Sequence, residues 1–359
     1  MSRGAARVIV GLSGGVDSAV AALLLRDAGH EVHGLYMANW EEEDEYCTAA
    51  RDYQDARSVA RELGIVLHRV SFAAQYRERV FAAFLDEYRA GRTPNPDVLC
   101  NREIKFGLCL AYTARLGATH FATGHYARLQ HTADGIALLK ATDAAKDQSY
   151  FLHAVPRSQL QRVLFPLGEL DKQQVRQRAR EAGLPVFDKP DSTGICFIGE
   201  RPFAEFLRRY IPDSPGPIET LAGRPLGQHR GLHYYTLGQR TGMELGGMAG
   251  TAAEPWYVAA KDMARNVLCV VQKHDEDRLN CRQLSALAVN WLCPPPAQSF
   301  VAAVKVRYRQ PDQQAELQPL GDGVEVRFVT PQRAVATGQS AVFYAGERCL
   351  GGGVIANTL

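Results

Sequence analysis

The feature that most constrains this chain is a glycine-rich turn between a strand and a helix, close to the N-terminus. Residues 8–10 are all β-branched and apolar, residues 11–18 read GLSGGVDS, and residues 19–28 have the composition of a helix. Glycine lets backbone N–H groups converge on a phosphate, and a helix N-terminus adds its positive dipole. The sequence therefore predicts a phosphate-binding turn that opens an α/β domain.

This turn differs from a Walker loop in its charge. The G-x-x-x-x-G-K-[ST] pattern places a lysine at the β and γ phosphates, whereas residues 11–18 contain no lysine. They offer instead the hydroxyls of Ser13 and Ser18, and the carboxylate of Asp17 is available to hold Mg²⁺ on the phosphates. The alternative interpretation is an ordinary turn that serine and aspartate cap.

The first 125 residues alternate strand-like and helix-like segments. We expect strands at residues 7–10, 31–37, 65–70 and 120–124, and helices at residues 49–63 and 76–88, where apolar residues recur at helical spacing. Gly64 follows the first of these helices as a C-terminal cap. Strands and helices in this alternation predict a doubly wound parallel sheet.

The second half of the chain is predicted to be richer in strands. A helix should begin after Asp171, which forms a capping box with Gln174, and another should cover residues 203–211. Beyond Pro212, short segments separated by glycine and proline predict β structure, with barrel strands at residues 300–308, 324–329 and 341–344. The expected domains are an α/β domain at residues 1–200, a β-rich central domain at 201–275 and a C-terminal β-barrel at 276–359.

Composition narrows the class of protein. No apolar run approaches the roughly 18 residues of a membrane helix, and no signal peptide is recognisable, so we expect a soluble, cytoplasmic protein with no membrane partner. The eight cysteines form no C-x-x-C pair and are too sparse for a disulfide scaffold, so no metal site built from protein alone is expected. Basic clusters at residues 172–180, 201–209 and 305–309 predict either a face for a phosphate backbone or ordinary solvated surface.

Two segments carry cysteines beside turn-forming residues. Residues 91–106 contain two prolines and an asparagine, which predict an extended, exposed loop with Asp97 and Cys100 accessible at a helix N-terminus, where a thiolate is favoured. Residues 189–199 contain Cys196 beside glycine. The alternative for any lone cysteine is a small buried apolar residue, which we expect for Cys109, Cys269 and Cys293.

The order serine, glycine, glycine, hydrophobe, aspartate, serine after a first strand resembles the pyrophosphate loop of the ATP pyrophosphatases. Those enzymes cleave ATP between the α and β phosphates and adenylate their substrate. The resemblance implies an ATP site formed by the turn and by two residues at the adenine and ribose: Gly11, Leu12, Ser13, Gly14, Gly15, Val16, Asp17 and Ser18 of the turn, with Met37 and Gly124. Met37 taken alone is more typical of a core residue.

Further motifs make nearly the whole chain similar to the tRNA 2-thiouridylase family. Besides the turn, the matching segments are residues 39–40, 95–106, 123–126, 146–151, 192–199, 237–240, 307–309, 338–344 and 350–353. The resemblance implies that ATP, with Mg²⁺, serves the transfer of sulfur to uridine in tRNA. It also implies an ATP pyrophosphatase domain followed by a central β-rich domain and a tRNA-binding barrel.

For the two loop cysteines the resemblance implies unequal roles. ATP adenylates the oxygen at C2 of uridine, and Cys196, loaded as a persulfide by a sulfur-relay protein, supplies sulfur directly or after Cys100 releases it as hydrosulfide. Cys100 then forms a disulfide with Cys196, which cellular reductant reopens. Asp97 is implied as a general acid or base, with Asn95 and Pro96 lining the pocket of the target base.

The resemblance also implies that the protein extrudes the wobble uridine from the anticodon loop of tRNA. The positions that match tRNA contacts in the family are His125, Lys146, Asp147, Gln148, Arg307, Tyr308 and Gln339. Each of them, taken alone, is equally consistent with a hydrogen bond at the protein surface.

Two other classes of protein remain open from the sequence. One is another ATP pyrophosphatase, an amidotransferase-linked synthetase or a tRNA lysidine synthetase, in which nitrogen is the nucleophile and two loop cysteines are not needed. The other is a non-catalytic RNA-binding or redox-switch protein whose cysteine pair senses oxidants. Release of pyrophosphate from ATP on addition of tRNA would exclude the second class.

Overall fold

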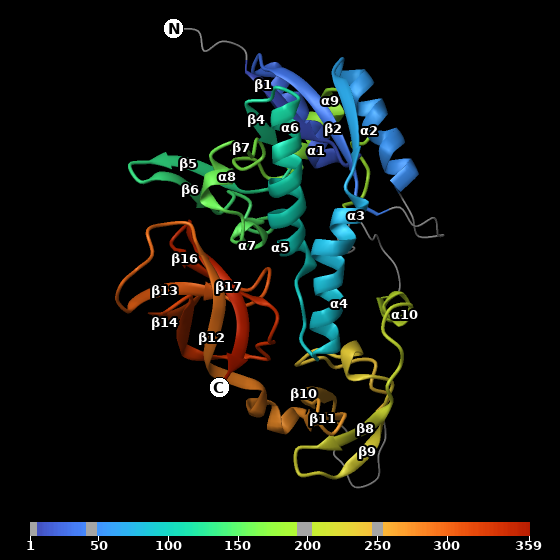
Figure 1. The fold of residues 1–359 in the computed structure, drawn as a ribbon, viewed down its shortest axis with the longest axis vertical. Coiled ribbons are helices and arrows are strands. Elements are labelled where there is room, and N and C mark those ends of the chain that lie inside the picture. The colour runs from blue at the N-terminus through green and yellow to red at the C-terminus, as the bar shows by residue number, and fades with distance from the viewer. Residues whose placement is uncertain (1–5, 41–48, 192–202, 246–253) are drawn as a thin grey trace.

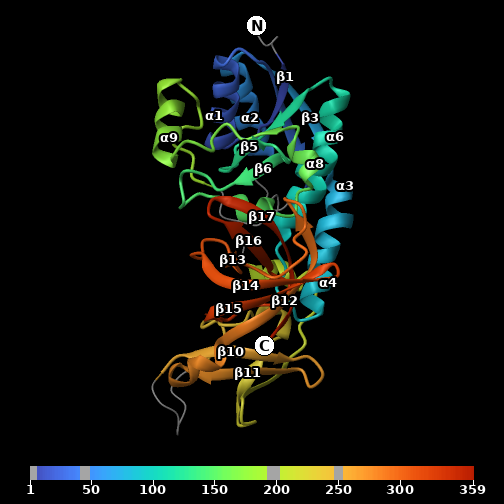
Figure 2. The ribbon, with the colours of Figure 1, turned by 90° about the vertical axis from the view of Figure 1, so that its left-hand side faces the viewer.

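A computed structural model of the protein describes residues 6–40, 49–191, 203–245 and 254–359. Three regions follow one another along the longest axis: an N-terminal α/β domain, a barrel beside its lower end, and a small β domain at the far end (Figures 1 and 2). No helix within the described ranges is long and apolar enough to cross a membrane.

The N-terminal domain is built on a sheet of five parallel strands in the order β3-β2-β1-β4-β7. Alternate residues of central strand β1 enter different cores: Val8 and Val10 belong to the core that includes residues of helices α1, α2 and α9, whereas Ile9 belongs to the core that includes Phe106 and Phe121. A sheet buried on both faces is the doubly wound arrangement that the alternating sequence predicts, so this expectation is confirmed.

The strand positions in this domain agree with the sequence-based expectations to within a few residues. Its strands are β1 (Arg7–Gly11), β2 (Glu31–Ala38), β3 (Val66–Ser71), β4 (His120–Ala122) and β7 (Val163–Leu164), with a hairpin of β5 (Arg128–Thr132) and β6 (Gly135–Leu139). The fourth expected strand is shorter than predicted, because residues 123–124 leave the sheet beside the glycine-rich turn.

The helices are α1 (Val16–Asp27), α2 (Ala49–Leu63), α3 (Ala73–Tyr76), α4 (Ala82–Arg89), α5 (Pro96–Cys100), α6 (Leu110–Arg115), α7 (Ser149–Leu152), α8 (Arg157–Leu160), α9 (Lys172–Glu181) and α10 (Phe203–Arg208). A π-helical segment, Arg77–Phe81, joins α3 to α4, so the helix expected at residues 76–88 lies within a longer helical run. The capping box between Asp171 and Gln174 is present at the start of α9, as predicted.

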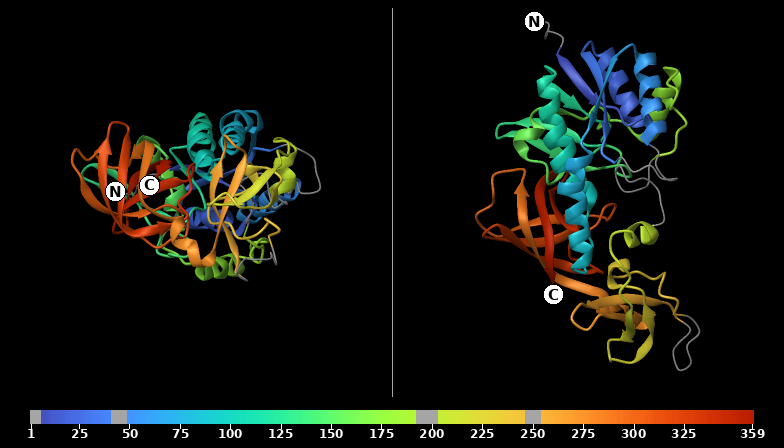
Figure 3. Two further views of the ribbon diagram at one scale, coloured as in Figure 1. Left: turned by 90° about the horizontal axis from the view of Figure 1, so that it is seen from below. Right: turned by 45° about the vertical axis from the view of Figure 1, so that its right-hand side comes forward.

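The central region is a four-stranded sheet in the order β10-β11-β8-β9. Its strands are β8 (Gly216–Thr220), β9 (Pro225–His229), β10 (Trp256–Asp262) and β11 (Val267–Gln272), and 3₁₀ helices lie at Leu232–Tyr234 and Lys273–Leu279. A small apolar core that includes Ile218, Tyr235 and Trp256 holds the sheet together. Figure 3 shows this region at the end of the molecule opposite the N-terminus.

The C-terminal region is an antiparallel barrel, as the sequence predicts. Its strands are β12 (Asn280–Trp291), β13 (Phe300–Lys305), β14 (Gln313–Leu320), β15 (Gly323–Arg333), β16 (Ser340–Ala345) and β17 (Arg348–Thr358). The strands are paired in the order β12-β15-β14-β13-β16-β17, and pairing of β12 with β17 closes the ring. Inward side chains such as Leu284, Val326 and Phe343 fill the interior.

One contact between regions was not foreseen from the sequence. Strand β6 of the N-terminal domain pairs with β17, so the hairpin β5–β6 extends the barrel sheet. The ion pairs Arg128–Glu347 at 2.9 Å and Lys140–Asp312 at 2.6 Å lie along the same seam. The barrel is therefore joined to the N-terminal domain by backbone hydrogen bonds as well as by side chains.

Candidate functional site

The glycine-rich turn lies at the carboxyl end of β1, the central strand of the parallel sheet. Strands β2 and β4 lie on opposite sides of β1, so the strand order of the sheet reverses at β1. Ligands bind at such a point in open α/β sheets. Gly14 has φ +79°, and a Cβ on it would collide with the backbone of Asp52. Only glycine fits this position without strain.

The N-terminus of α1 is open toward this turn. Gly15 is its N-cap, and among the described residues no side chain caps the helix. The Ser18 hydroxyl instead donates to the carbonyl of Gly15 at 3.0 Å and accepts from the N–H of Ser13 at 3.2 Å, which fixes the shape of the turn. Helix N–H groups without a side-chain cap are suited to an anion such as phosphate.

The other two predicted ATP residues lie against the turn. A Cβ on Gly124, just after β4, would stand 2.8 Å from the backbone of Asp17 and Ser18, so the two segments touch. The methyl carbon of Met37, from β2, lies 3.7 Å from the place that a Cβ on Gly11 would take. The structure thus brings Met37 and Gly124 together with the turn, and their contact with a nucleotide stays a prediction.

Asp17, the second residue of α1, forms an ion pair with a lysine. The ammonium of Lys172 donates to both of its carboxylate oxygens, at 2.7 and 2.8 Å, and the hydroxyl of Tyr126 donates at 2.8 Å. Burial raises the pKa of Tyr126, and the neighbouring Asp17 raises it further. The carboxylate therefore fits the Mg²⁺ expected with ATP, although no cluster of three metal-ligating side chains occurs in the described part of the chain.

Several basic side chains gather beside the turn. Lys146, Lys172 and Arg176 all contact the carboxylate of Asp191, at 2.7, 2.7 and 3.2 Å. Burial would raise the pKa of Asp191, but hydrogen bonds from the two lysines lower it to about 2. Lys189 donates to the carbonyl of Gly14 at 3.0 Å. Basic side chains therefore lie beside a turn that contains no lysine of its own, and each of them is paired with a carboxylate in this structure.

Sequence analysis did not find Lys172 as part of the site. Helix α9 was expected from its capping box, but the packing of α9 on α1, which carries Lys172 to Asp17, joins residues 155 positions apart. The missing lysine in the turn was the available signal, because a triphosphate requires positive charge from elsewhere in the fold.

The segment with Cys100 differs from the expected exposed loop. Asn95 caps α5 by accepting from the N–H of Val98, and Pro96 is the first helical residue, where proline is favoured. Asp97 lies half-buried in the first turn, as a residue at a helix N-terminus. Cys100 ends α5 and is fully buried, and a π-helical segment, Asn101–Cys109, follows directly.

The expectation of an accessible Cys100 is therefore wrong for this structure. The apolar residues that follow it, Ile104 and Phe106, are buried in the same core as Cys100. Because the helical run that contains all three packs on this core, the thiol is buried with them. Cys196 lies outside the described residues, so its relation to Cys100 is a prediction. Cys109 is buried as expected, and burial raises its pKa, whereas Cys269 and Cys293 are half-buried.

Two of the residues predicted to contact tRNA are buried. His125 packs against the rings of Phe106 and Phe165 and shares a hydrogen bond of 2.7 Å with Thr123. Burial, with a smaller contribution from Lys105, lowers the pKa of His125 well below its usual value, so the ring is neutral. Asp147 accepts from Ser149 and from the N–H of Ala141. Neither side chain faces solvent in this structure.

The other predicted tRNA residues contact the protein itself. Gln148 accepts from the N–H of Tyr126, and Tyr308 packs on Phe151 with ring centroids 4.4 Å apart. Arg307 donates to the carbonyls of Leu237 and Ala334, which lie in the central region and the barrel. Gln339 donates to the carbonyls of residues 93 and 94. Contact of any of these residues with RNA stays a prediction.

Three family models match the chain in succession. Residues 6–200 match the tRNA methyl transferase HUP domain, residues 204–272 match the tRNA methyl transferase PRC-barrel domain, and residues 281–355 match the aminomethyltransferase β-barrel domain. The three matches fall in turn on the N-terminal domain with its hairpin β5–β6, on the central sheet and on the barrel.

Curated relatives align with nearly the full length of the chain. A protein of Marinobacter nauticus, named tRNA-specific 2-thiouridylase MnmA, is 56% identical over 98% of this chain and 91% of its own. A protein of Cupriavidus metallidurans with the same name is 54% identical over 97% of this chain and 99% of its own.

Similarity to solved structures is much lower. A 4-thiouridine synthetase solved with RNA and bound ATP is 19% identical and has a TM-score of 0.34, covering 58% of this chain and 50% of that chain. Structural similarity this low does not identify the family of the chain, whereas the full-length relatives do.

Proposed function

The chain belongs to the family of tRNA-specific 2-thiouridylases, and from this we propose that it replaces the C2 oxygen of the wobble uridine in tRNA by sulfur, with cleavage of ATP to AMP and pyrophosphate. The observation that carries the proposal is 56% identity over 98% of the chain. The geometry of the turn supports the part of the reaction that uses ATP.

We assign the ATP site to the turn of residues 11–18 with Met37 and Gly124. The open N-terminus of α1 would hold the phosphates by its N–H groups, and Lys172 stands beside them with positive charge. Asp17 would hold Mg²⁺ on the phosphates, where the ion neutralises negative charge. Lys172, which pairs with Asp17 in this structure, would supply positive charge to the phosphates.

The first chemical step converts a poor leaving group into a good one. The C2 oxygen of uridine attacks the α phosphorus of ATP, the bond to the β phosphate breaks, and pyrophosphate leaves. The oxygen then departs with AMP when sulfur attacks C2. Asp97, at the first turn of α5, would act as the general acid or base beside the base, with Asn95 and Pro96 lining its pocket.

The second step needs sulfur at the oxidation level of sulfide. A sulfur-relay protein would load Cys196 as a persulfide, and the Cys100 thiolate would attack the inner sulfur of that persulfide, forming the Cys100–Cys196 disulfide and releasing hydrosulfide. The two thiols lose two electrons and the transferred sulfur gains them. A cellular thiol reductant then reopens the disulfide. Because Cys100 is fully buried, this step requires the packing around its thiol to open.

The proposed substrate is the anticodon loop of tRNA, with the uridine extruded from its stack. We expect Lys146 and Gln148 near the turn and Arg307 and Tyr308 near the barrel to lie along the RNA, with His125 and Asp147 supporting them from inside. With tRNA as the substrate and a cellular thiol as the reductant, the compartment that we propose for the reaction is the cytoplasm.

The proposal is tested by incubating the protein with ATP, unmodified tRNA and a persulfide donor. The expected products are AMP, pyrophosphate and 2-thiouridine, the last detected by mass spectrometry of nucleosides from the digested tRNA. Formation of ADP and orthophosphate would contradict the ATP chemistry. Formation of AMP and pyrophosphate without sulfur in the tRNA would favour a pyrophosphatase with a nitrogen nucleophile.

A further inference from the structure

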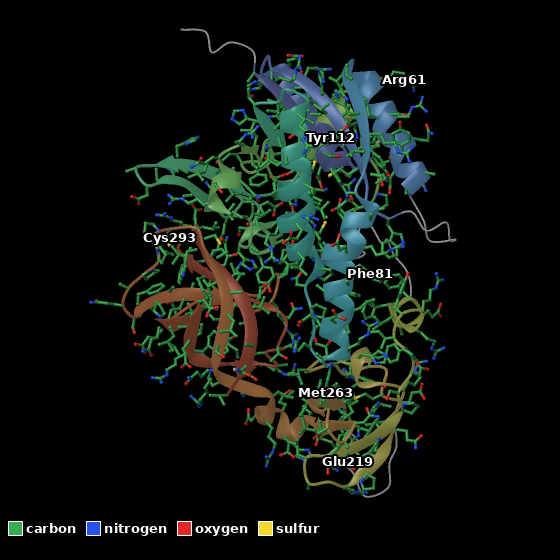
Figure 4. The ribbon with its side chains drawn as sticks, in the orientation of Figure 1. Arg61, Phe81, Tyr112, Glu219, Met263 and Cys293 are labelled. Carbon is green, nitrogen blue, oxygen red and sulfur yellow. The ribbon has the colours of Figure 1, made fainter. Side chains whose placement is uncertain are left out.

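The four residues that lead into α5 lie where all three regions of the molecule meet. This junction segment, Gly91 to Pro94, connects the end of α4 to the helix that carries Asp97 and Cys100. Figure 4 labels Met263, from the central region, close to the lower end of α4, and Figure 1 shows the barrel on the other side.

The barrel holds the second half of the junction segment by its backbone. The N–H of Thr93 donates to the carbonyl of Thr337 at 2.9 Å, and the amide of Gln339 donates to the carbonyls of Thr93 and Pro94 at 2.9 and 3.2 Å. Gly338 has φ +87°, and a Cβ on it would lie 3.0 Å from the Thr93 oxygen. The barrel loop therefore approaches too closely for a larger residue.

The central region holds the first half. The ammonium of Lys261, from β10, donates to the carbonyl of Gly91 at 2.9 Å. The side chain of Met263 fills the space beside the α carbon of Gly91, and the hydroxyls of Thr236 and Thr93 lie 3.3 Å apart. Burial lowers the pKa of Lys261 to about 8, because the ammonium group is largely removed from water where it contacts the segment.

Residues within the N-terminal domain complete the arrangement. Arg92 makes two bonds of 2.6 Å to the carboxylate of Glu87 in α4, and its N–H donates to the Glu87 carbonyl at 2.9 Å. The segment thus has little freedom left, because its carbonyls at residues 91, 93 and 94 are bonded to side chains from two other regions.

We propose that Gln339 and Lys261 are positioning residues that set the place of Asp97 and Cys100 through the junction segment. Both act from regions that contain none of the implied catalytic side chains. The inference rests on the proposed function, and for Gln339 it replaces a contact with RNA by a contact with the protein's own backbone.

The physical reason lies in the start of α5. Pro94 directly precedes Asn95, the N-cap of the helix, so the carbonyls that Gln339 binds fix the direction in which α5 leaves. A displacement of about 1 Å in a reacting group can lower a rate about 10²-fold. A barrel or central region that shifts relative to the N-terminal domain would therefore move the chemistry with it.

The test uses Gln339→Met and Lys261→Met, which keep length and remove the donors. With ATP and tRNA saturating, the single-turnover rate of 2-thiouridine formation should fall by up to about 10²-fold, while the Kd for tRNA and the KM for ATP stay at parental values. The retained tRNA binding also shows that the variants are folded. Matched controls are Gln318→Met in the barrel and Lys273→Met in the central region, both at exposed positions, and both should keep the parental rate.

Two outcomes would overturn the inference. If Gln339→Met weakened tRNA binding but kept the saturating rate, Gln339 would be an RNA contact. If both variants kept rate and affinity, the junction segment would not position α5. Failure of the parental protein to form 2-thiouridine would instead count against the proposed function, so the two failures are distinguishable.

Discussion

The turn of residues 11–18 and the helix α5 are the two parts of the candidate site, and they are held in different ways. The turn is fixed by its own glycines, by the Ser18 hydroxyl and by neighbours in the same parallel sheet. Helix α5 is fixed at its start by side chains from the barrel and the central region. The part that handles ATP is thus built locally, whereas the part that carries Cys100 depends on the whole chain.

This difference predicts that substitutions can separate the ATP-dependent step from the transfer of sulfur. Changes in the turn should affect adenylation, whereas changes on α5 should affect the transfer of sulfur to uridine. Both kinds of change should leave the loading of sulfur on Cys196 intact. The first three predictions change residues of the turn, of α5 or of the basic cluster beside the turn and measure activity. The fourth changes Asp191 in that cluster and measures the stability of the fold. They run from the largest expected effect to the smallest.

The largest effect is expected for the cysteine. Cys100→Ser should abolish 2-thiouridine formation, because serine cannot form the disulfide that releases sulfur, while tRNA-dependent release of pyrophosphate continues. Asp17→Ala should show the opposite pattern, with Cys196 still accepting a persulfide and pyrophosphate release lost. Mass spectrometry of the cysteine peptides and a pyrophosphate assay measure the two activities. Loss of pyrophosphate release in Cys100→Ser would show that the two parts cannot be separated.

The next effect is expected for the acid–base group on α5. Asp97→Asn should slow the chemical step about 10²- to 10⁴-fold, the usual contribution of a general acid or base, with persulfide loading unchanged. Single-turnover thiolation at saturating ATP measures it. A parental rate would leave Asp97 as a helix residue of the first turn, with another group moving the proton.

A smaller effect is expected for the lysine beside the turn. Lys172→Met should raise the KM for ATP about 10- to 100-fold, the equivalent of about 1.5–3 kcal/mol for a lost hydrogen bond to a charged group. The control is Arg178→Met, at an exposed position of the same helix α9. An unchanged KM in Lys172→Met would mean that the ammonium only neutralises Asp17.

The smallest effect concerns stability. Because hydrogen bonds lower the pKa of Asp191 to about 2, its ionised form stabilises the fold above about pH 4, and this contribution is lost as the pH falls from 4 toward 2. The side chain is 33% exposed, so solvent screening reduces the contribution to about 1 kcal/mol. Urea unfolding should show Asp191→Asn as less stable than the parent at pH 7, with the gap closing near pH 2. A constant gap would assign the loss to packing.

What the sequence predicts well in this protein is what neighbouring residues decide. The turn, helix α2 and the capping box of α9 are local patterns, and each is found at the expected residues. The burial of Cys100 was not predicted, because prolines at residues 94 and 96 suggest an extended loop. Its burial results from packing in the core that also contains Phe106. The contacts of Lys172 with Asp17 and of Gln339 with the carbonyl of Thr93 could not be predicted for the same reason, since these partners lie 155 and 246 residues away.

The pairing of β6 with β17 has a consequence for how the chain is made. Domains of a growing chain fold from the N-terminus, and β17 (Arg348–Thr358) is synthesised long after its partner β6 (Gly135–Leu139). Until then β6 remains an open strand edge, with N–H and C=O groups able to pair with another molecule. The N-terminal domain can therefore fold early around its parallel sheet, but the edge of β6 is covered only after the barrel strand β17 has been made.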